Sequence, residues 1–114
     1  MHELGIIVHV AKTLKHVALQ ENVSKIGSVT LEIGEVSGIV ESYLTDCWEY
    51  YRKKDELIED SKLIIEKIEA VTYCDDCEKT YPTVQYGRQY PYCKGYNTWL
   101  AVGNECNIKE IEAC

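Results

Sequence analysis

The sequence lacks the segments that would take a protein into a membrane or out of the cell. In its 114 residues no apolar run approaches the roughly 20 residues that span a bilayer. The amino-terminal stretch also lacks the basic start, apolar centre and small-residue cleavage site of a signal peptide. We therefore expect a cytoplasmic protein that does not act at a membrane.

Positive charge is scarce as well. Twelve lysines and arginines stand against 19 aspartates and glutamates, which gives a formal net charge of −7. Nucleic-acid phosphates and anionic lipid surfaces would on average repel such a chain. We therefore expect no nucleic-acid partner.

Motifs of familiar enzymes are missing too. The sequence shows no internal repeat, no Ser/His/Asp set, no phosphate-cradling glycine loop and no paired catalytic carboxylates. We therefore expect a protein that is not an enzyme.

The six cysteines, in a reducing compartment, argue against a disulfide framework and leave metal binding, redox chemistry or burial as their roles.

Hydrophobic periodicity predicts an α+β fold. Apolar residues three and four apart indicate helices, and alternating apolar residues indicate strands. The predicted helices cover residues 4–18 and 44–51, and residues 21–28 are predicted as a turn. The predicted strands cover residues 29–33, 63–68, 99–102 and 108–111. We expect a short mixed sheet with two helices packed on one face, and a small zinc-ribbon-like satellite.

The composition predicts where the domains divide. Residues 1–70, completed by the strand at 99–114, would form the α/β domain. Residues 71–98 would form a zinc-ribbon-like domain inserted before the last strand, because their cysteine, tyrosine, proline, glycine and charge cannot build a core.

The inserted segment carries a C-x-x-C pair, Cys74 and Cys77. This spacing lets a tight turn aim two thiolates at one tetrahedral ion. Cys93 lies where the second pair of a zinc ribbon belongs, and Tyr90 stands where that pair would begin. We therefore predict Cys74, Cys77 and Cys93 as zinc ligands. A redox role for Cys74 and Cys77 is disfavoured, because neighbouring acidic residues raise thiol pKa values.

The sequence leaves the identity of the fourth zinc ligand open. Tyr90 is a poor candidate, because its phenol must lose a proton with a pKa of about 10, against about 8.5 for cysteine. Cys106, Cys114 or a water molecule are the alternatives. Cys106 lies in a predicted strand, where burial is the simpler expectation, and Cys114 is expected to be exposed.

The start of the chain, Met1-His2-Glu3, gathers metal donors. The terminal amine, the His2 amide and the His2 imidazole can chelate one ion, and planar nitrogen-rich sets suit Ni(II) or Cu(II). Glu3 adds a carboxylate, although an acidic residue at a helix start is also explained by the helix dipole. His9 and His16 follow seven residues apart on the first helix and are expected as surface histidines.

The whole arrangement resembles the HypA/HybF family of hydrogenase-maturation nickel metallochaperones. The resemblance is carried by Met1-His2-Glu3 before an amphipathic helix, by the Gly34-Glu35-Val36-Ser37-Gly38 strand end, by the C-x-x-C and the incomplete second pair, and by Gly103-Asn104-Glu105 before the last strand. It covers nearly the entire chain in order and spacing.

The resemblance implies a nickel-binding domain in residues 1–70 and a structural zinc domain. His2 matches the nickel ligand, with the Met1 amine and Glu3 as candidate contributors, and Tyr90 departs from the zinc pattern. It also implies delivery of Ni(II) into [NiFe]-hydrogenase, with urease as another candidate recipient. The implied partners are a nickel-handling GTPase and the hydrogenase large subunit or its assembly complex, and a homodimer is left open. The alternative function is a zinc-knuckle protein-interaction module without nickel transfer.

Overall fold

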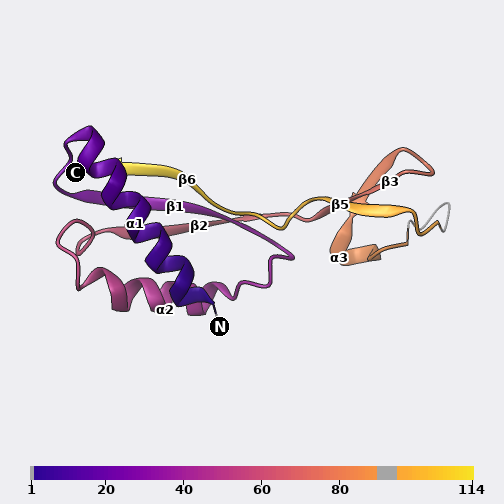
Figure 1. Cartoon of the computed structure of the whole chain (residues 1–114). Coiled ribbons are helices and arrows are strands. Elements are labelled where there is room, and N and C mark those ends of the chain that lie inside the picture. Colours follow the sequence, from indigo (N-terminus) through magenta and orange to yellow (C-terminus); the bar gives the residue numbers. More distant parts are fainter. Residues whose placement is uncertain (1, 90–94) are drawn as a thin grey trace. The chain divides into compact units, whose positions relative to one another are not determined.

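The computed structural model describes residues 2–89 and 95–114, which form helices and two small sheets (Figure 1). The helices are α1 (Glu3–Glu21), α2 (Glu41–Arg52) and α3 (Thr83–Tyr86). The strands are β1 (Ile26–Gly34), β2 (Lys62–Ile68), β3 (Val71–Cys74), β4 (Lys79–Pro82), β5 (Thr98–Val102) and β6 (Cys106–Ala113). The sheets have the strand orders β2-β1-β6 and β4-β3-β5. The predicted α+β class is confirmed.

The chain forms two compact units. The first consists of Met1–Leu31, Ile39–Glu66 and Asn107–Cys114, and the second of Glu32–Gly38 and Lys67–Cys106. Strands β1, β2 and β6 each contribute residues to both units. The domain boundaries expected from the composition stay a prediction.

The first unit is built on the apolar face of α1. Its buried apolar residues recur three and four apart: Ile7, Val10, Ala11, Leu14 and Ala18. The sequence pattern predicted this spacing but placed Leu4 and Val8 on the buried face in place of Val10, and the structure leaves Leu4 exposed and Val8 half-buried. They share the core with residues of α2 and β1, of which Trp48 is the largest fully buried side chain. The Trp48 Nε1–H donates to the Ser61 carbonyl at 3.1 Å, so the one polar atom of this indole is satisfied in the core.

The turn predicted at residues 21–28 is shorter in the structure. Helix α1 continues to Glu21 and ends where Asn22 adopts the left-handed conformation (φ 56°), which asparagine tolerates better than most residues. Strand β1 already begins at Ile26, whose N–H donates to the Leu57 carbonyl at 2.9 Å. This partner is distant in sequence, so the local pattern could not indicate the start of the strand.

The second unit is built on β3, which pairs antiparallel with both β4 and β5. The sequence predicted that residues 99–102 would return to the main sheet, and this prediction is wrong. In the structure they pair with β3, and Trp99 is the register partner of Tyr73. The two rings lie 5.3 Å apart between centroids, a favourable distance for an aromatic pair. The Tyr73–Trp99 pair therefore stabilises β5 in the second sheet.

Two glycines of the second unit allow a close backbone approach. The Gly34 N–H donates to the Glu105 carbonyl at 2.8 Å, and the Val36 N–H donates to the Gly103 carbonyl at 2.9 Å. A Cβ at Gly34 would overlap the Gly103 carbonyl group, and a Cβ at Gly103 would overlap Ala70. Neither position has room for a side chain.

Two carboxylates bind backbone amides beside this approach. Glu35 accepts the Ala70 N–H at 2.9 Å, and Glu105 accepts the Gly103 N–H at 2.9 Å. Hydrogen bonds to charged groups are about twice as strong as neutral ones. The segments at residues 34–36, 70 and 103–105 are thus joined by both steric fit and charge-assisted hydrogen bonds.

Replacing Gly34 by alanine should destabilise the protein by about 1–3 kcal/mol or more, because the added methyl group must displace the Gly103 backbone. The Gly5→Ala variant is the matched control, because nothing lies within 4 Å of a Cβ at that helical position. It should stabilise the protein by roughly 0.5–1 kcal/mol. Chemical denaturation of both variants measures the two changes, and equal stabilities would contradict the steric argument.

Candidate metal-binding sites

The described part of the amino terminus begins at His2, which is exposed and immediately precedes α1. Its carbonyl accepts the Ile6 N–H at 3.0 Å, the first hydrogen bond of the helix. Its imidazole makes no capping hydrogen bond with the helix. Met1 lies outside the described residues. The structure therefore places the His2 side chain in solvent at the start of a regular helix.

Glu3 lies in the first turn of α1 and is only 3% exposed. Its Oε2 accepts the Val40 N–H at 3.1 Å. Val40 is the residue before α2, and its carbonyl accepts the Leu44 N–H of that helix at 3.0 Å. The carboxylate is therefore near the amino-terminal ends of two helices, where unsatisfied N–H groups and the helix dipoles favour negative charge.

The contact between Glu3 and Val40 gives Glu3 a structural role that the sequence did not indicate. The sequence offered two roles, a metal contributor and a residue that complements the dipole of its own helix. The structure adds a bond to the start of α2, 37 residues away, which no local pattern signals. A role of Glu3 in metal binding stays a prediction, and one of its oxygens has a structural partner.

Replacing Glu3 by alanine should lower the free energy of unfolding by about 1–2 kcal/mol, because the Val40 N–H loses a charged acceptor. Glu21→Ala is the matched control at the opposite end of α1, where a negative charge is unfavourable to the helix dipole. It should leave stability unchanged or slightly raise it. Thermal or denaturant unfolding distinguishes the variants, and similar losses in both would refute a special role for Glu3.

The C-x-x-C pair lies on the turn that joins β3 to β4. Cys74 is the last residue of β3, and its carbonyl accepts the Glu78 N–H at 2.7 Å. Glu78 has a φ of +58°, a left-handed conformation that closes the turn and that side chains rarely adopt. Cys74 is 0% exposed and clusters with Tyr81, and the partly buried Cys77 packs against this cluster. One short turn therefore carries both thiols, as the spacing predicted.

This turn fits the donor chemistry of a structural zinc ion. Two thiols two residues apart on a tight turn are half of a tetrahedral thiolate site, and partial burial strengthens their hold on a cation. The predicted third ligand, Cys93, lies outside the described residues, and so does Tyr90, the residue at the fourth position. Among residues 2–89 and 95–114, no three side chains of His, Cys, Asp or Glu form a group that could hold a metal ion.

The two substitute ligands lie in different places. Cys106 begins β6 and is exposed, so the expected burial of this residue is wrong. Partial desolvation nevertheless raises the pKa of its thiol, which disfavours the thiolate that a metal ligand must supply. Cys114 is exposed, and its N–H donates to the Lys25 carbonyl at 3.1 Å within the first unit. The assignment of the fourth ligand stays a prediction.

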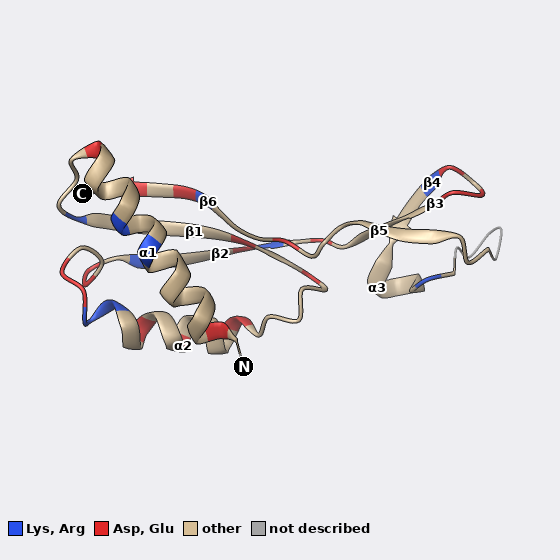
Figure 2. Cartoon of the chain, viewed as in Figure 1, with Lys and Arg blue, Asp and Glu red and all other residues tan. Residues whose placement is uncertain are grey.

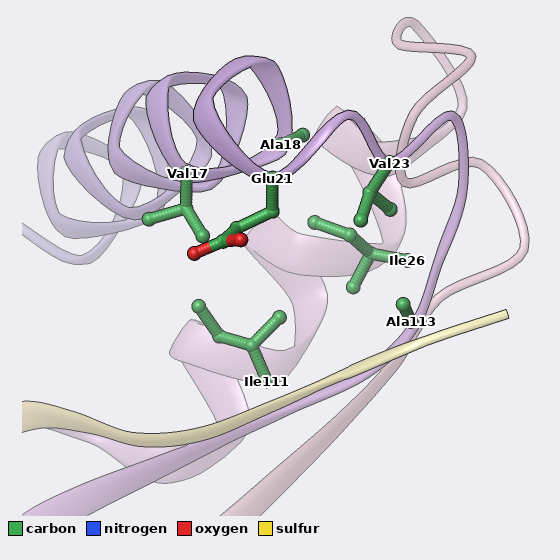
Figure 3. Close-up of a pocket in the computed structure, with 7 residues that line it drawn as sticks. All are labelled: Val17, Ala18, Glu21, Val23, Ile26, Ile111 and Ala113. Atoms are coloured by element: carbon green, nitrogen blue, oxygen red, sulfur yellow. The ribbon is translucent and has the colours of Figure 1, made fainter.

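A cavity of about 180 Å³ lies at the carboxyl end of α1 (Figure 3). It is lined by apolar side chains such as Val17, Ile26 and Ile111, and Glu21 is the one ionisable residue in its wall. Figure 3 shows the Glu21 carboxylate between Val17 and Ile111. A single carboxylate is not a ligand set for a metal ion, so this cavity is not a candidate metal site.

The fold and its donors define a class of small α+β proteins with an exposed histidine at the start of the first helix and a thiol pair on a hairpin turn. A family model described as "Hydrogenase/urease nickel incorporation, metallochaperone, hypA" matches residues 1–113. The chain therefore belongs to the HypA family of nickel metallochaperones. The resemblance noted from the sequence is confirmed.

Individual relatives agree with the family. The chain is 33% identical to the hydrogenase maturation factor HypA of Dehalococcoides mccartyi, over 98% of this chain and 93% of that protein. It is also 33% identical to the HypA of Geobacter metallireducens, over 98% of each chain. The solution structure of the Ni metallochaperone HypA from Helicobacter pylori shares the fold with a TM-score of 0.73 at 24% identity, covering 99% of this chain and 97% of that one.

No helix within residues 2–89 and 95–114 combines the length and the apolar character needed to cross a membrane.

Proposed function

We propose that the chain carries Ni(II) on its amino terminus and delivers it for the maturation of [NiFe]-hydrogenase, with urease as a second candidate recipient. His2 is the principal ligand, and the Met1 amine and Glu3 contribute. Nickel is the cargo of this protein. The partners are a nickel-handling GTPase and the hydrogenase large subunit or its assembly complex, and the protein acts in the cytoplasm.

The observation that carries this proposal is the exposed His2 at the start of α1, in a chain whose family is one of nickel metallochaperones. A carrier must hold its ion where a partner can reach it, because transfer proceeds by exchange of ligands. An imidazole in solvent meets this need, since a partner's donor can enter before His2 leaves. Imidazole and amide nitrogens also suit Ni(II) better than Mg(II) or Ca(II).

The bond from Val40 to Glu3 supports this role by fixing the first turn of α1. A ligand set that spans only the first residues of a chain loses conformational entropy when the ion binds. Anchoring Glu3 removes part of that freedom in advance and so lowers the cost of binding. Glu3 is then both an anchor and a nearby negative charge for the cation.

We propose further that Cys74, Cys77 and Cys93 hold a structural Zn(II), with the fourth position at Tyr90, Cys106 or Cys114. A bound zinc would close the segment from β3 to β5 with metal–thiolate bonds. The buried Cys74 and the turn that carries Cys77 support this assignment. The second unit has little aliphatic core, so such a bridge would contribute to its folding.

Replacing His2 by alanine should weaken Ni(II) binding at least about tenfold, because even outer-shell changes at metal sites cost 10–100-fold in affinity. His16→Ala is the matched control, since His16 is also exposed and lies on the same helix. It should leave the affinity unchanged. Isothermal titration calorimetry on both variants measures the difference.

Adding one residue before Met1 tests the same site independently, because it displaces the free amine. The carrier function predicts weaker Ni(II) binding in the extended chain. An interaction module without nickel transfer predicts unchanged binding in every variant. Equal affinities of the parent, His2→Ala and the extended chain would therefore rule out the proposed nickel site.

Zinc content should depend on the hairpin cysteines. Purified Cys74→Ser protein should lose bound zinc, measured by elemental analysis, and should lose ordered signals from the second unit in NMR spectra. Tyr90→Cys should bind zinc at least as tightly as the parent, because thiolate is the better ligand. Cys47→Ser, in α2 and outside the proposed ligand set, is the control for general thiol effects and should keep its zinc. Unchanged zinc in Cys74→Ser would contradict the assignment.

A further inference from the structure

We propose that the exposed face of α1 is a docking surface for an acidic surface on the protein that accepts the nickel. This surface, the outer face of α1, comprises Leu4, His9, Lys12, Lys15, His16 and Leu19. The proposal rests on the proposed function, because it concerns the partner that receives the ion from the same end of the chain.

The charge of the outer face is opposite to that of the whole chain. The protein has a formal net charge of −7, yet no acidic residue occurs between Leu4 and Gln20. The helix has two acidic residues, Glu3 and Glu21, at its two ends, and Figure 2 shows red only there. Lys12 and Lys15 are both exposed in the middle of the helix. The outer face is therefore a cationic stripe on an acidic protein.

The exposed histidines lie on this same face. His2, His9 and His16 are the three histidines of the chain, and all three are exposed. A spacing of seven residues shifts the position around a helix by only about 20°, so successive members lie on nearly the same side. Successive histidines are about 10 Å apart along the helix axis. A partner bound to the outer face would thus lie along a line that leads to His2.

Apolar side chains are exposed at both ends of the stripe. Leu4 is 45% exposed and Leu19 is 77% exposed. Leu19 belongs to α1 but not to the apolar spacing that forms the core, so folding of the first unit does not explain it. Interfaces commonly combine apolar anchors with charged groups that set orientation. The outer face has both elements.

Charge complementarity favours an acidic protein over other anionic partners. An extended phosphate backbone or a lipid bilayer would meet the rest of this acidic chain as well as α1, and would be repelled by it. A folded protein with a local acidic patch can contact α1 alone. The repulsion between the other surfaces then helps to select the one orientation that brings the acceptor to His2.

The test reverses the charge of the stripe. The Lys12→Glu, Lys15→Glu double variant is compared with Lys53→Glu, Lys62→Glu, which changes two exposed lysines of the first unit by the same total charge. Binding to the purified nickel-handling GTPase and to the hydrogenase large subunit is measured by biolayer interferometry at low and high salt. We expect the α1 variant to weaken the complex with the hydrogenase large subunit, the nickel acceptor, about tenfold or more at low salt, mainly through slower association. The control should change it less than threefold. Weakening of the GTPase complex alone would overturn the assignment to the acceptor.

Nickel affinity is measured in every variant, so that the two proposals fail separately. Normal Ni(II) binding with lost docking in the α1 variant alone supports the outer face. Normal Ni(II) binding with equal effects of both double variants, or with no complex of either partner, overturns it. If the parent protein itself does not bind Ni(II), the proposed function is overturned instead. Binding of the parent to vesicles with phosphatidylglycerol or to duplex DNA, abolished by the α1 changes, would assign the face to a membrane or nucleic acid and overturn the protein partner.

Discussion

The candidate nickel site depends on one hydrogen bond, from the Val40 N–H to the Glu3 carboxylate. It joins the beginning of α1 to the beginning of α2, two points that the sequence separates by 37 residues. This bond gives the first turn of α1 a partner outside its own helix, and helix ends without such contacts fray easily. The buried Glu3 therefore helps to order the backbone that carries the exposed His2. A carrier needs this combination, since its ligand must be both accessible and held in place.

The chain separates its two kinds of metal donor chemically. The amino terminus offers an imidazole in solvent, which suits an ion that leaves. The hairpin between β3 and β4 offers thiols of which Cys74 is fully buried, which suits an ion that stays. The softness of the ligands and their access to solvent both separate the two places, so the proposed Ni(II) and Zn(II) would not compete for one set of residues. The family membership and the exposed histidine are consistent with the first of these roles.

Local patterns predicted what depends on neighbours in the sequence. The spacing of apolar residues identified α1 and α2, and the C-x-x-C spacing identified a turn that carries both thiols. Two errors involve distant contacts: the first amide of β1 bonds Leu57, and β5 pairs with β3 rather than with the main sheet. The single turn α3 was missed for a local reason, because it is too short to leave a periodic signal. In the candidate site, the identity of His2 was visible in the sequence, whereas the partner of Glu3 was not.

The close approach of Gly34 and Gly103 has a consequence for the motions of the second unit. No side chain separates these backbones, and the N–H groups of Gly34 and Val36 are bonded to carbonyls from the other segment. Solvent can reach these protons only when the two segments part, because a local fluctuation of one side chain opens nothing here. They should therefore exchange with deuterium more slowly than their position beside a loop would suggest. The slowest-exchanging amides of this unit would then lie at the contact between Gly34 and Gly103 rather than in the middle of its sheet.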